Sequence, residues 1–264
     1  MKIRWTRSAL AAVGCLALIF SGCTKEQLVG AGRGAGLLDS DQHPFDLIIL
    51  CDASEYSTCQ ADTLRATLER LVLPAAASRP GSQVRLYTLG EDVVARLVAT
   101  RESTPAKRQS AKAILHHEVE WRRDALGFFT TAAAPVFASG PAQQSRIAEA
   151  LTRLANADHL DGAHRFLIVI SDLRETGIAK LEHGPVPAPR EFLDRLTSRE
   201  LLTSESLRGV RVLFTNTSIN TPIAVQADTP ARSQEIKELW RTAINHAGGV
   251  PEFYDQLPRN LERN

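Results

Sequence analysis

The sequence has no excess of charge of either sign and few cysteines, and its one long apolar run is too short to span a bilayer comfortably. Its 264 residues include 31 Lys or Arg and 30 Asp or Glu, a near-neutral balance that argues against a nucleic-acid partner. It contains neither the Gly-x-Ser-x-Gly motif of a nucleophile elbow nor the Gly-x-x-x-x-Gly-Lys motif that cradles phosphates. We also find no internal repeat, so one large domain is the default expectation.

The N-terminus has the parts of an export signal. A basic start is followed by an apolar stretch over residues 9–20 and by small residues that precede Cys23. The segment LIFSGC resembles a bacterial lipobox, in which the cysteine is diacylated and becomes the mature N-terminus. We therefore predict a lipoprotein signal peptide over residues 1–22 and lipidation at Cys23. A signal peptide cleaved elsewhere is the alternative.

The lipobox resemblance implies a soluble domain tethered to a membrane by its lipid. Thr24, rather than Asp, follows the cysteine, which resembles lipoproteins that are sorted onward to an outer membrane. We therefore expect an exported protein anchored on the periplasmic face of the cell envelope, at the outer membrane where the organism has one. Residues 23–43 are rich in glycine and poor in apolar residues, which predicts a flexible tether before a domain over residues 44–264.

Cleavage at this position changes the charge balance only slightly. It removes Lys2, Arg4 and Arg7 and no acidic residue, which leaves 28 Lys and Arg against 30 Asp and Glu. The mature chain therefore stays near neutral, and the argument against nucleic acid still holds.

Two of the four cysteines remain for the domain once Cys15 leaves with the signal and Cys23 is acylated. Cys51 and Cys59 could form a disulfide in an oxidising compartment, closing the loop that contains Asp52. Cys51 also lies in an expected strand, where its side chain could simply fill the core. Both interpretations stay open here, because geometry rather than spacing decides between them.

Apolar strands alternate with helical segments along the domain, which predicts βαβ units. The gap before residues 93–98 is too short for a helical crossover, so this strand should pair antiparallel with its predecessor at a sheet edge. The pattern predicts a three-layer, doubly wound α/β fold of Rossmann type, with a mostly parallel sheet. The expected strands are 45–51, 83–89, 93–98, 165–171 and 210–214, and the expected helices are 64–73, 105–130, 146–154, 190–201 and 233–247.

Two aspartates stand at the ends of two strands that should be buried. Asp52 follows the run FDLIILC and Asp172 follows FLIVIS, with hydroxyls nearby at Ser54 and Ser145. Ligands of open α/β sheets bind at this edge, so we expect one shared site there. Taken singly, each of these side chains could instead cap a helix or a turn. Glu175 is expected at the rim and in solvent.

These segments, in this order, resemble the von Willebrand factor A family, whose metal-ion-dependent adhesion site lies above the sheet. The family motif Asp-x-Ser-x-Ser is matched by Asp52 and Ser54, with Tyr56 at the third position and Ser57 one residue late. The family's helix-start Thr is matched by Ser145. The strand-end aspartate is matched by Asp172, and the resemblance covers roughly residues 45–250.

The resemblance implies a bound divalent cation. Mg²⁺, or Mn²⁺ in its place, prefers carboxylate and hydroxyl oxygens, and an incomplete shell leaves a position for an acidic side chain of a partner protein. The alternative is that Tyr56 disables the site and leaves a metal-free domain of the same fold. The implied ligands are Asp52, Ser54, Ser57, Ser145 and Asp172.

The sequence therefore predicts a membrane-tethered, exported protein-binding module rather than an enzyme. One alternative is a metal-free structural lipoprotein of an envelope or conjugation assembly. Another is a divalent-metal phosphoesterase that uses Asp52 as nucleophile or ligand.

Overall fold

The computed structural model describes residues 43–54, 59–89, 95–104, 110–157, 164–181, 184–215, 229–258 and 261. The chain divides into two compact units, one made of residues 1–42 with 106–119 and one of residues 43–105 with 120–264. Of the smaller unit, the structure describes residues 110–119, which are almost entirely the first part of helix α5 (Ala111–Ala138). The fold and the site described below belong to the larger unit. Within the described ranges, no helix combines the length and apolar character needed to cross a membrane.

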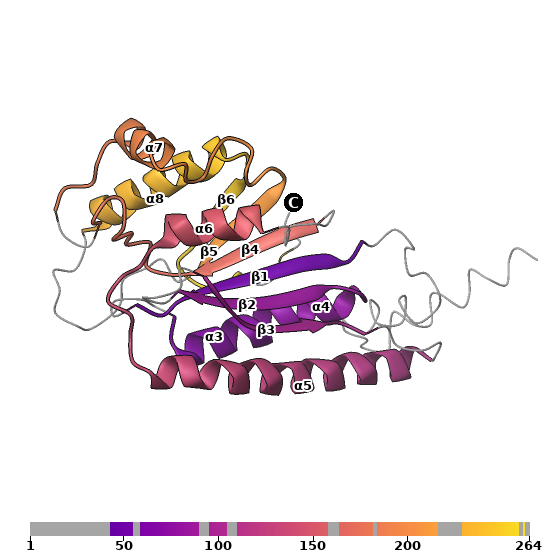
Figure 1. Ribbon diagram of the computed structural model, residues 1–264. Coiled ribbons are helices and arrows are strands. Elements are labelled where there is room, and N and C mark those ends of the chain that lie inside the picture. Colours follow the sequence, from indigo (N-terminus) through magenta and orange to yellow (C-terminus); the bar gives the residue numbers. More distant parts are fainter. Residues whose placement is uncertain are drawn as a thin grey trace, which may run out of the picture. The chain divides into compact units, whose positions relative to one another are not determined.

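A six-stranded sheet with strand order β3-β2-β1-β4-β5-β6 forms the centre of the larger unit (Figure 1). All neighbouring strands pair parallel except β2 and β3, which pair antiparallel at one edge. This confirms the predicted three-layer α/β class. The strands are β1 (Phe45–Asp52), β2 (Gln83–Leu89), β3 (Arg96–Glu102), β4 (His164–Ile170), β5 (Val210–Thr215) and β6 (Val250–Tyr254).

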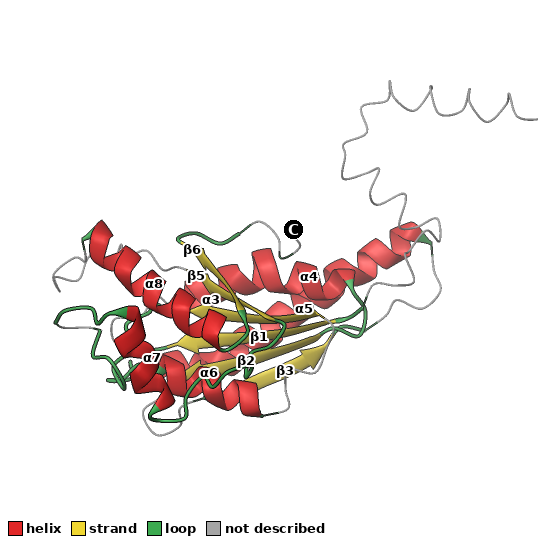
Figure 2. Ribbon diagram, turned by 90° about the horizontal axis from the view of Figure 1, so that it is seen from above, coloured by secondary structure: helices red, strands yellow, loops and turns green. Residues whose placement is uncertain are grey.

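Helices cover both faces of the sheet, as the alternation of its buried residues requires. Ile48 and Leu50 of β1 belong to one hydrophobic core, which they share with α6, α7 and α8, while Leu47 and Ile49 belong to the other. Figure 2 shows α6, α7 and α8 across the face turned to the viewer. These helices are α6 (Ile147–Asn156), α7 (Pro189–Thr197) and α8 (Pro230–His246).

The opposite core is filled by the helices that follow β1 and by the second part of α5. Trp121, Ala125, Phe129 and Ala133 recur every four residues and form the buried stripe of α5. The helical segments after β1 are α3 (Ala61–Thr67), the π-helical turn η2 (Leu68–Val72) and α4 (Leu73–Ser78).

The predicted helix end at Pro74 is wrong, because the helical segment continues to Ser78. Pro74 lies at the start of α4, where a missing N–H costs little, and the π-helical turn at Leu68–Val72 precedes it. Proline thus begins a new helical segment here instead of ending one.

The two edge strands differ most from the sequence expectation. The antiparallel pairing of the strand after β2 is confirmed, but β3 begins at Arg96 and runs to Glu102, later than the expected 93–98. Strand β6 was not predicted at all. It is five residues long, contains Pro251 and leaves Val250 half-exposed, so it shows neither a buried run nor clear alternation.

Candidate functional site

The carboxyl ends of the parallel strands meet at one edge of the sheet, and the strand register decides which side chains lie level there. Cys51 of β1 pairs with Ile170 of β4, so the next residues, Asp52 and Ser171, leave the two strands side by side. Cys51 and Ile170 both belong to the core that includes α3 and α5. Because side chains alternate along a strand, Asp52 and Ser171 share the opposite face, on which α6 packs.

Asp52 is fully buried and accepts hydrogen bonds from three segments of the chain. Its Oδ2 accepts from the hydroxyls of Ser145 and Ser171, each at 2.7 Å. Its Oδ1 accepts from the backbone N–H of Ser54 at 3.1 Å. We call Asp52, Ser54, Ser145 and Ser171 the Asp52 cluster. It joins the loop after β1, the loop before α6 and the loop after β4.

Burial raises the pKa of the Asp52 carboxyl above its usual range, and the hydrogen bonds from Ser171, Ser145 and Ser54 oppose that rise. A carboxylate without solvent access depends on such donors, because an unsatisfied buried acceptor is expensive. The donors therefore make it feasible to place a carboxylate at this point of the core.

Asp172 lies one residue beyond Ser171 and makes different contacts. Its Oδ1 accepts from the backbone N–H of Arg174 at 3.1 Å, and its Oδ2 lies 3.6 Å from Nε of Arg174. Both side chains are about 95 % buried. The second strand-end carboxylate is thus paired with a guanidinium group of its own loop.

The loop after β4 is fastened to the start of α6. The Ser145 N–H donates to Thr176 Oγ1 at 2.9 Å, while the N–H and hydroxyl of Thr176 both donate to the Ser145 carbonyl. At its other end the loop is held by Trp240 of α8, whose Nε1–H donates to the Leu173 carbonyl at 3.0 Å. Both loops that carry the hydroxyls of the Asp52 cluster are therefore fixed by further contacts.

Glu175, expected at the solvated rim, is fully buried instead. Its Oε2 accepts from the N–H of Ala148 in the first turn of α6 at 2.9 Å, and its Oε1 accepts from the N–H of Gly177 at 2.7 Å. The side chain thus acts as an N-terminal cap supplied by another loop. Burial raises its pKa from 4.5 to about 7, opposed by these two N–H donors and supported by the nearby charges of Glu149 and Asp52.

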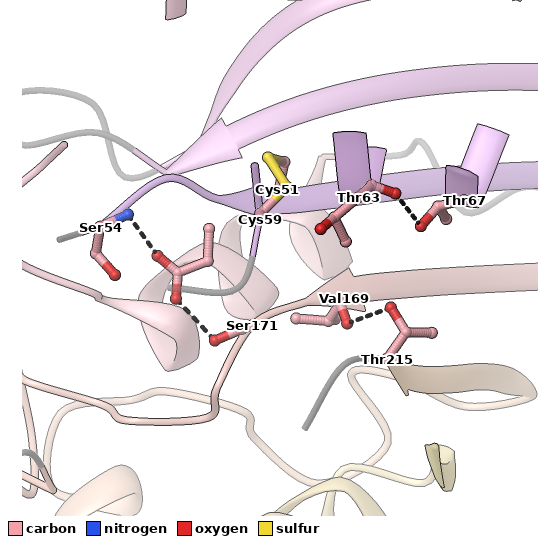
Figure 3. The surroundings of a disulfide bond; sticks show 9 residues. Cys51, Ser54, Cys59, Thr63, Thr67, Val169, Ser171 and Thr215 are labelled. Atoms are coloured by element: carbon pink, nitrogen blue, oxygen red, sulfur yellow. Dashed lines mark hydrogen bonds between the residues drawn. A yellow bond between two sulfur atoms is a disulfide. The ribbon is translucent and has the colours of Figure 1, made fainter. Parts of the chain in front are cut away.

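A disulfide joins Cys51 and Cys59. Of the two interpretations that the sequence left open, the disulfide is therefore the one found in the structure. Figure 3 shows the disulfide close to the hydrogen bonds that Ser54 and Ser171 make. Next to Ser54, the Ala142 N–H donates to the Ala53 carbonyl at 3.0 Å, and Ser54 forms a bridge with Ala142. The start of the loop after β1 is thus held by covalent and backbone bonds.

Several predicted residues lie outside the described residues. They are Tyr56 and Ser57 in the loop after β1, and Cys23 with the rest of the signal and tether. The roles assigned to Ser57 and Cys23 stay predictions.

The structure brings together two of the predicted site side chains, Asp52 and Ser145, together with the backbone N–H of Ser54. It adds Ser171 and Thr176, which the sequence did not assign to the site, and it buries Glu175, which was expected at the solvated rim. Ser171 could have been found by aligning the two apolar runs, since it occupies the strand position that matches Asp52. The loop-to-loop contacts of Thr176 and Glu175 leave no periodic signal in the sequence.

The two carboxylates, as the structure arranges them, do not fit a shared divalent cation. Asp52 already accepts three hydrogen bonds and is cut off from solvent, while the guanidinium of Arg174 lies beside Asp172 and would repel a second cation. Among the described residues, no group of three or more His, Cys, Asp or Glu side chains could hold a metal ion.

A comparison of the sequence with models of known protein families gives no match, and a comparison with curated protein sequences gives none either.

Proposed function

We propose that the chain is an exported, lipid-anchored module of the von Willebrand factor A type that binds another protein through the loops at the carboxyl edge of its sheet. The resemblance of Asp52, Ser54, Ser145 and Asp172 to the family motif supports this class. In this proposal binding is metal-free, and the anchor is the lipid on Cys23.

The observation that carries the proposal is the Asp52 cluster. A buried carboxylate bonded to two hydroxyls from different loops rigidifies the edge where α/β folds bind ligands. Rigid loops favour binding, because less conformational entropy is lost when a partner docks. The disulfide and the Ser145–Thr176 bonds act in the same direction.

The same geometry weighs against the phosphoesterase alternative. A nucleophilic carboxylate must reach the phosphorus atom of a substrate, whereas Asp52 has no exposed surface and both of its oxygens are hydrogen-bonded. In this proposal Asp52 holds the loops together through its hydrogen bonds, and the protein is a binding module rather than an enzyme.

Site-specific photo-crosslinking in intact cells that produce the full chain tests the docking edge. A photoreactive amino acid replaces Gln143, which is exposed in the loop before α6, or Gln83, which is exposed at the opposite end of the sheet on β2. We expect a crosslinked species of one defined mass from position 143 and none from position 83. Equal crosslinking from both positions, or none from position 143, would contradict docking at this edge.

The anchor is tested separately by labelling the same cells with a radioactive fatty acid. The parent chain should incorporate label and sediment with membranes, while Cys23→Ser should do neither. Labelling that survives in Cys23→Ser would remove the lipoprotein part of the proposal.

The metal-free structural alternative predicts that partner recovery is unchanged when the Asp52 cluster is disrupted by Asp52→Asn.

A further inference from the structure

Two adjoining pockets beside the Asp52 cluster are lined by an unusual concentration of positive charge. The first, of about 510 Å³, includes Arg146, Lys180 and Arg199, and the second, of about 320 Å³, includes Arg153 and again Arg199. Glu149, the one carboxylate among the described residues of this lining, belongs to both pockets. We call the four cationic residues Arg146, Arg153, Lys180 and Arg199 with this space the basic groove. The chain as a whole has a formal net charge of only +1.

Two of these cations are held in place and two are available. Nη1 of Arg199 donates to the Gly177 carbonyl at 2.9 Å, and Nε of Arg146 donates to Gln144 Oε1 at 2.9 Å. Within the described part of the chain, neither Arg153 nor Lys180 forms a hydrogen bond or an ion pair, and both are exposed. A ligand that brings negative charge would therefore gain partners without breaking existing ion pairs of Arg153 and Lys180.

The wall of the groove at Gly177 depends on the absence of a side chain. A Cβ atom there would lie 2.9 Å from Oε1 of Glu175, 3.4 Å from Oε1 of Glu149 and 3.5 Å from Cγ of Arg146. Thr176, the preceding residue, also lines the first pocket and is bonded to Ser145 of the Asp52 cluster. This wall of the groove is thus part of the loop that the cluster holds.

We propose that the basic groove binds an acidic protein segment, one carboxylate side chain in each pocket. Charge complementarity selects an anionic ligand, and two adjoining pockets suit side chains carried on one extended chain. Glu149 between the pockets opposes a closely spaced series of doubly charged phosphates more strongly than it opposes single carboxylates. The proposal rests on the proposed function in that the ligand is a protein, and it names the chemistry of that partner.

Fluorescence anisotropy of the full chain with a labelled ten-residue glutamate peptide tests the groove, with a ten-residue glutamine peptide and a ten-nucleotide single-stranded DNA as matched probes. We expect binding of the glutamate peptide, weakened by added salt, and weaker or no binding of the other two probes. The double variant Arg153→Gln/Lys180→Gln should weaken binding of the glutamate peptide roughly tenfold.

A second double variant, Arg123→Gln/Arg208→Gln, removes the same charge from exposed arginines elsewhere and should stay within about twofold of the parent. Equal weakening in both double variants would overturn the proposal, since it would reduce the effect to overall charge. Absence of glutamate-peptide binding by the parent would overturn it as well. If the DNA binds more tightly than the glutamate peptide, the ligand of the basic groove is a nucleic acid and not an acidic protein segment.

The crosslinking experiment at Gln143 separates failure of the groove from failure of the docking function. If the double variant Arg153→Gln/Lys180→Gln still gives the crosslinked species, docking at the edge is retained. The proposal that the basic groove binds an acidic segment of the partner is then overturned. Glutamate-peptide binding that needs Arg153 and Lys180, without a crosslinked partner in cells, would keep the groove and contradict the docking function.

Discussion

Ser171 lies level with Asp52 across the β1–β4 pair and donates its hydroxyl hydrogen to Asp52 Oδ2 at 2.7 Å. The Asp52 carboxylate therefore finds its partner in the residue before Asp172 and not in Asp172 itself. The two side chains lie on the same face of the sheet because side chains alternate along each of the two paired parallel strands. It also places the site on the face of the sheet that α6 covers, since Ser145 at the start of that helix donates to the same oxygen.

Replacing Ser171 with alanine should destabilise the fold. The variant removes one donor from the buried Asp52 carboxyl group, and leaving a buried acceptor without its partner costs about 1–3 kcal/mol. Equilibrium unfolding in urea at neutral pH measures the change. Ser198→Ala, which removes an exposed hydroxyl that donates to the Arg195 carbonyl, is the control and should change stability by less than about 0.5 kcal/mol. Equal effects of the two substitutions would mean that the bond to Asp52 contributes nothing special.

The central part of the fold could be predicted from sequence because its strands are either apolar runs, as in β1, or alternate apolar with polar residues, as in β2. β1 and β2 match the expected residues within one position, and α6 follows the spacing of Ile147, Leu151 and Leu154. The edges could not be predicted equally well. An edge strand is half-solvated and needs neither a continuous apolar run nor strict alternation, so β6 left no pattern and β3 was placed too early.

The candidate site could be predicted only in part, because several of its contacts depend on how the loops turn and not on a pattern along a strand. Sequence order indicated that Asp52 and Ser145 would meet, and the structure joins them. It could not indicate that Asp172 would pair with Arg174 two residues later, because that choice depends on how the loop turns after β4. Nor could it indicate the burial of Glu175, whose hydrogen-bond donors come from the backbone of α6 and of its own loop.

Removal of the disulfide should lower stability without removing the fold. Cys51 and Cys59 are eight positions apart, and closing a loop of this size restricts the unfolded chain by about 2–3 kcal/mol. The double variant Cys51→Ala/Cys59→Ala should lose about that much free energy of unfolding. A reducing agent should destabilise the parent and leave the double variant unchanged. Parent stability that is insensitive to reductant would contradict a disulfide that contributes to the fold.

Titration of the protein with Mg²⁺ and Mn²⁺ should give no binding that depends on the two strand-end aspartates. Asp172 already has a cationic neighbour in Arg174, and the oxygens of Asp52 are already hydrogen-bonded. Isothermal calorimetry of the parent, Asp52→Asn and Asp172→Asn measures this. Binding by the parent that both variants lose would restore the adhesion-type metal site and would require the loop with Tyr56 and Ser57 to contribute to it.

Glu175 should make the protein less stable as the pH rises, the reverse of the effect of a salt-bridged carboxylate. Burial raises its pKa from 4.5 to about 7, so the folded protein keeps this proton to a higher pH than the unfolded chain does. The stabilising effect is complete below pH 4.5 and is lost as the pH approaches about 7, by about 3 kcal/mol for this group alone. Urea unfolding across this pH range measures the loss.

A neutral side chain of the same shape isolates the contribution of Glu175. Glu175→Gln has no titrating group at this position, so the stability of the variant should fall less steeply than that of the parent between about pH 5 and about pH 7. Glu191→Gln, at an exposed position of α7, should keep the steep slope of the parent. Gly177→Ala provides an independent test, because its Cβ would lie 2.9 Å from Glu175 Oε1 and would displace that carboxylate from the Gly177 N–H. If Glu175→Gln and the parent gave parallel curves, the pH dependence of stability would have to come from another group.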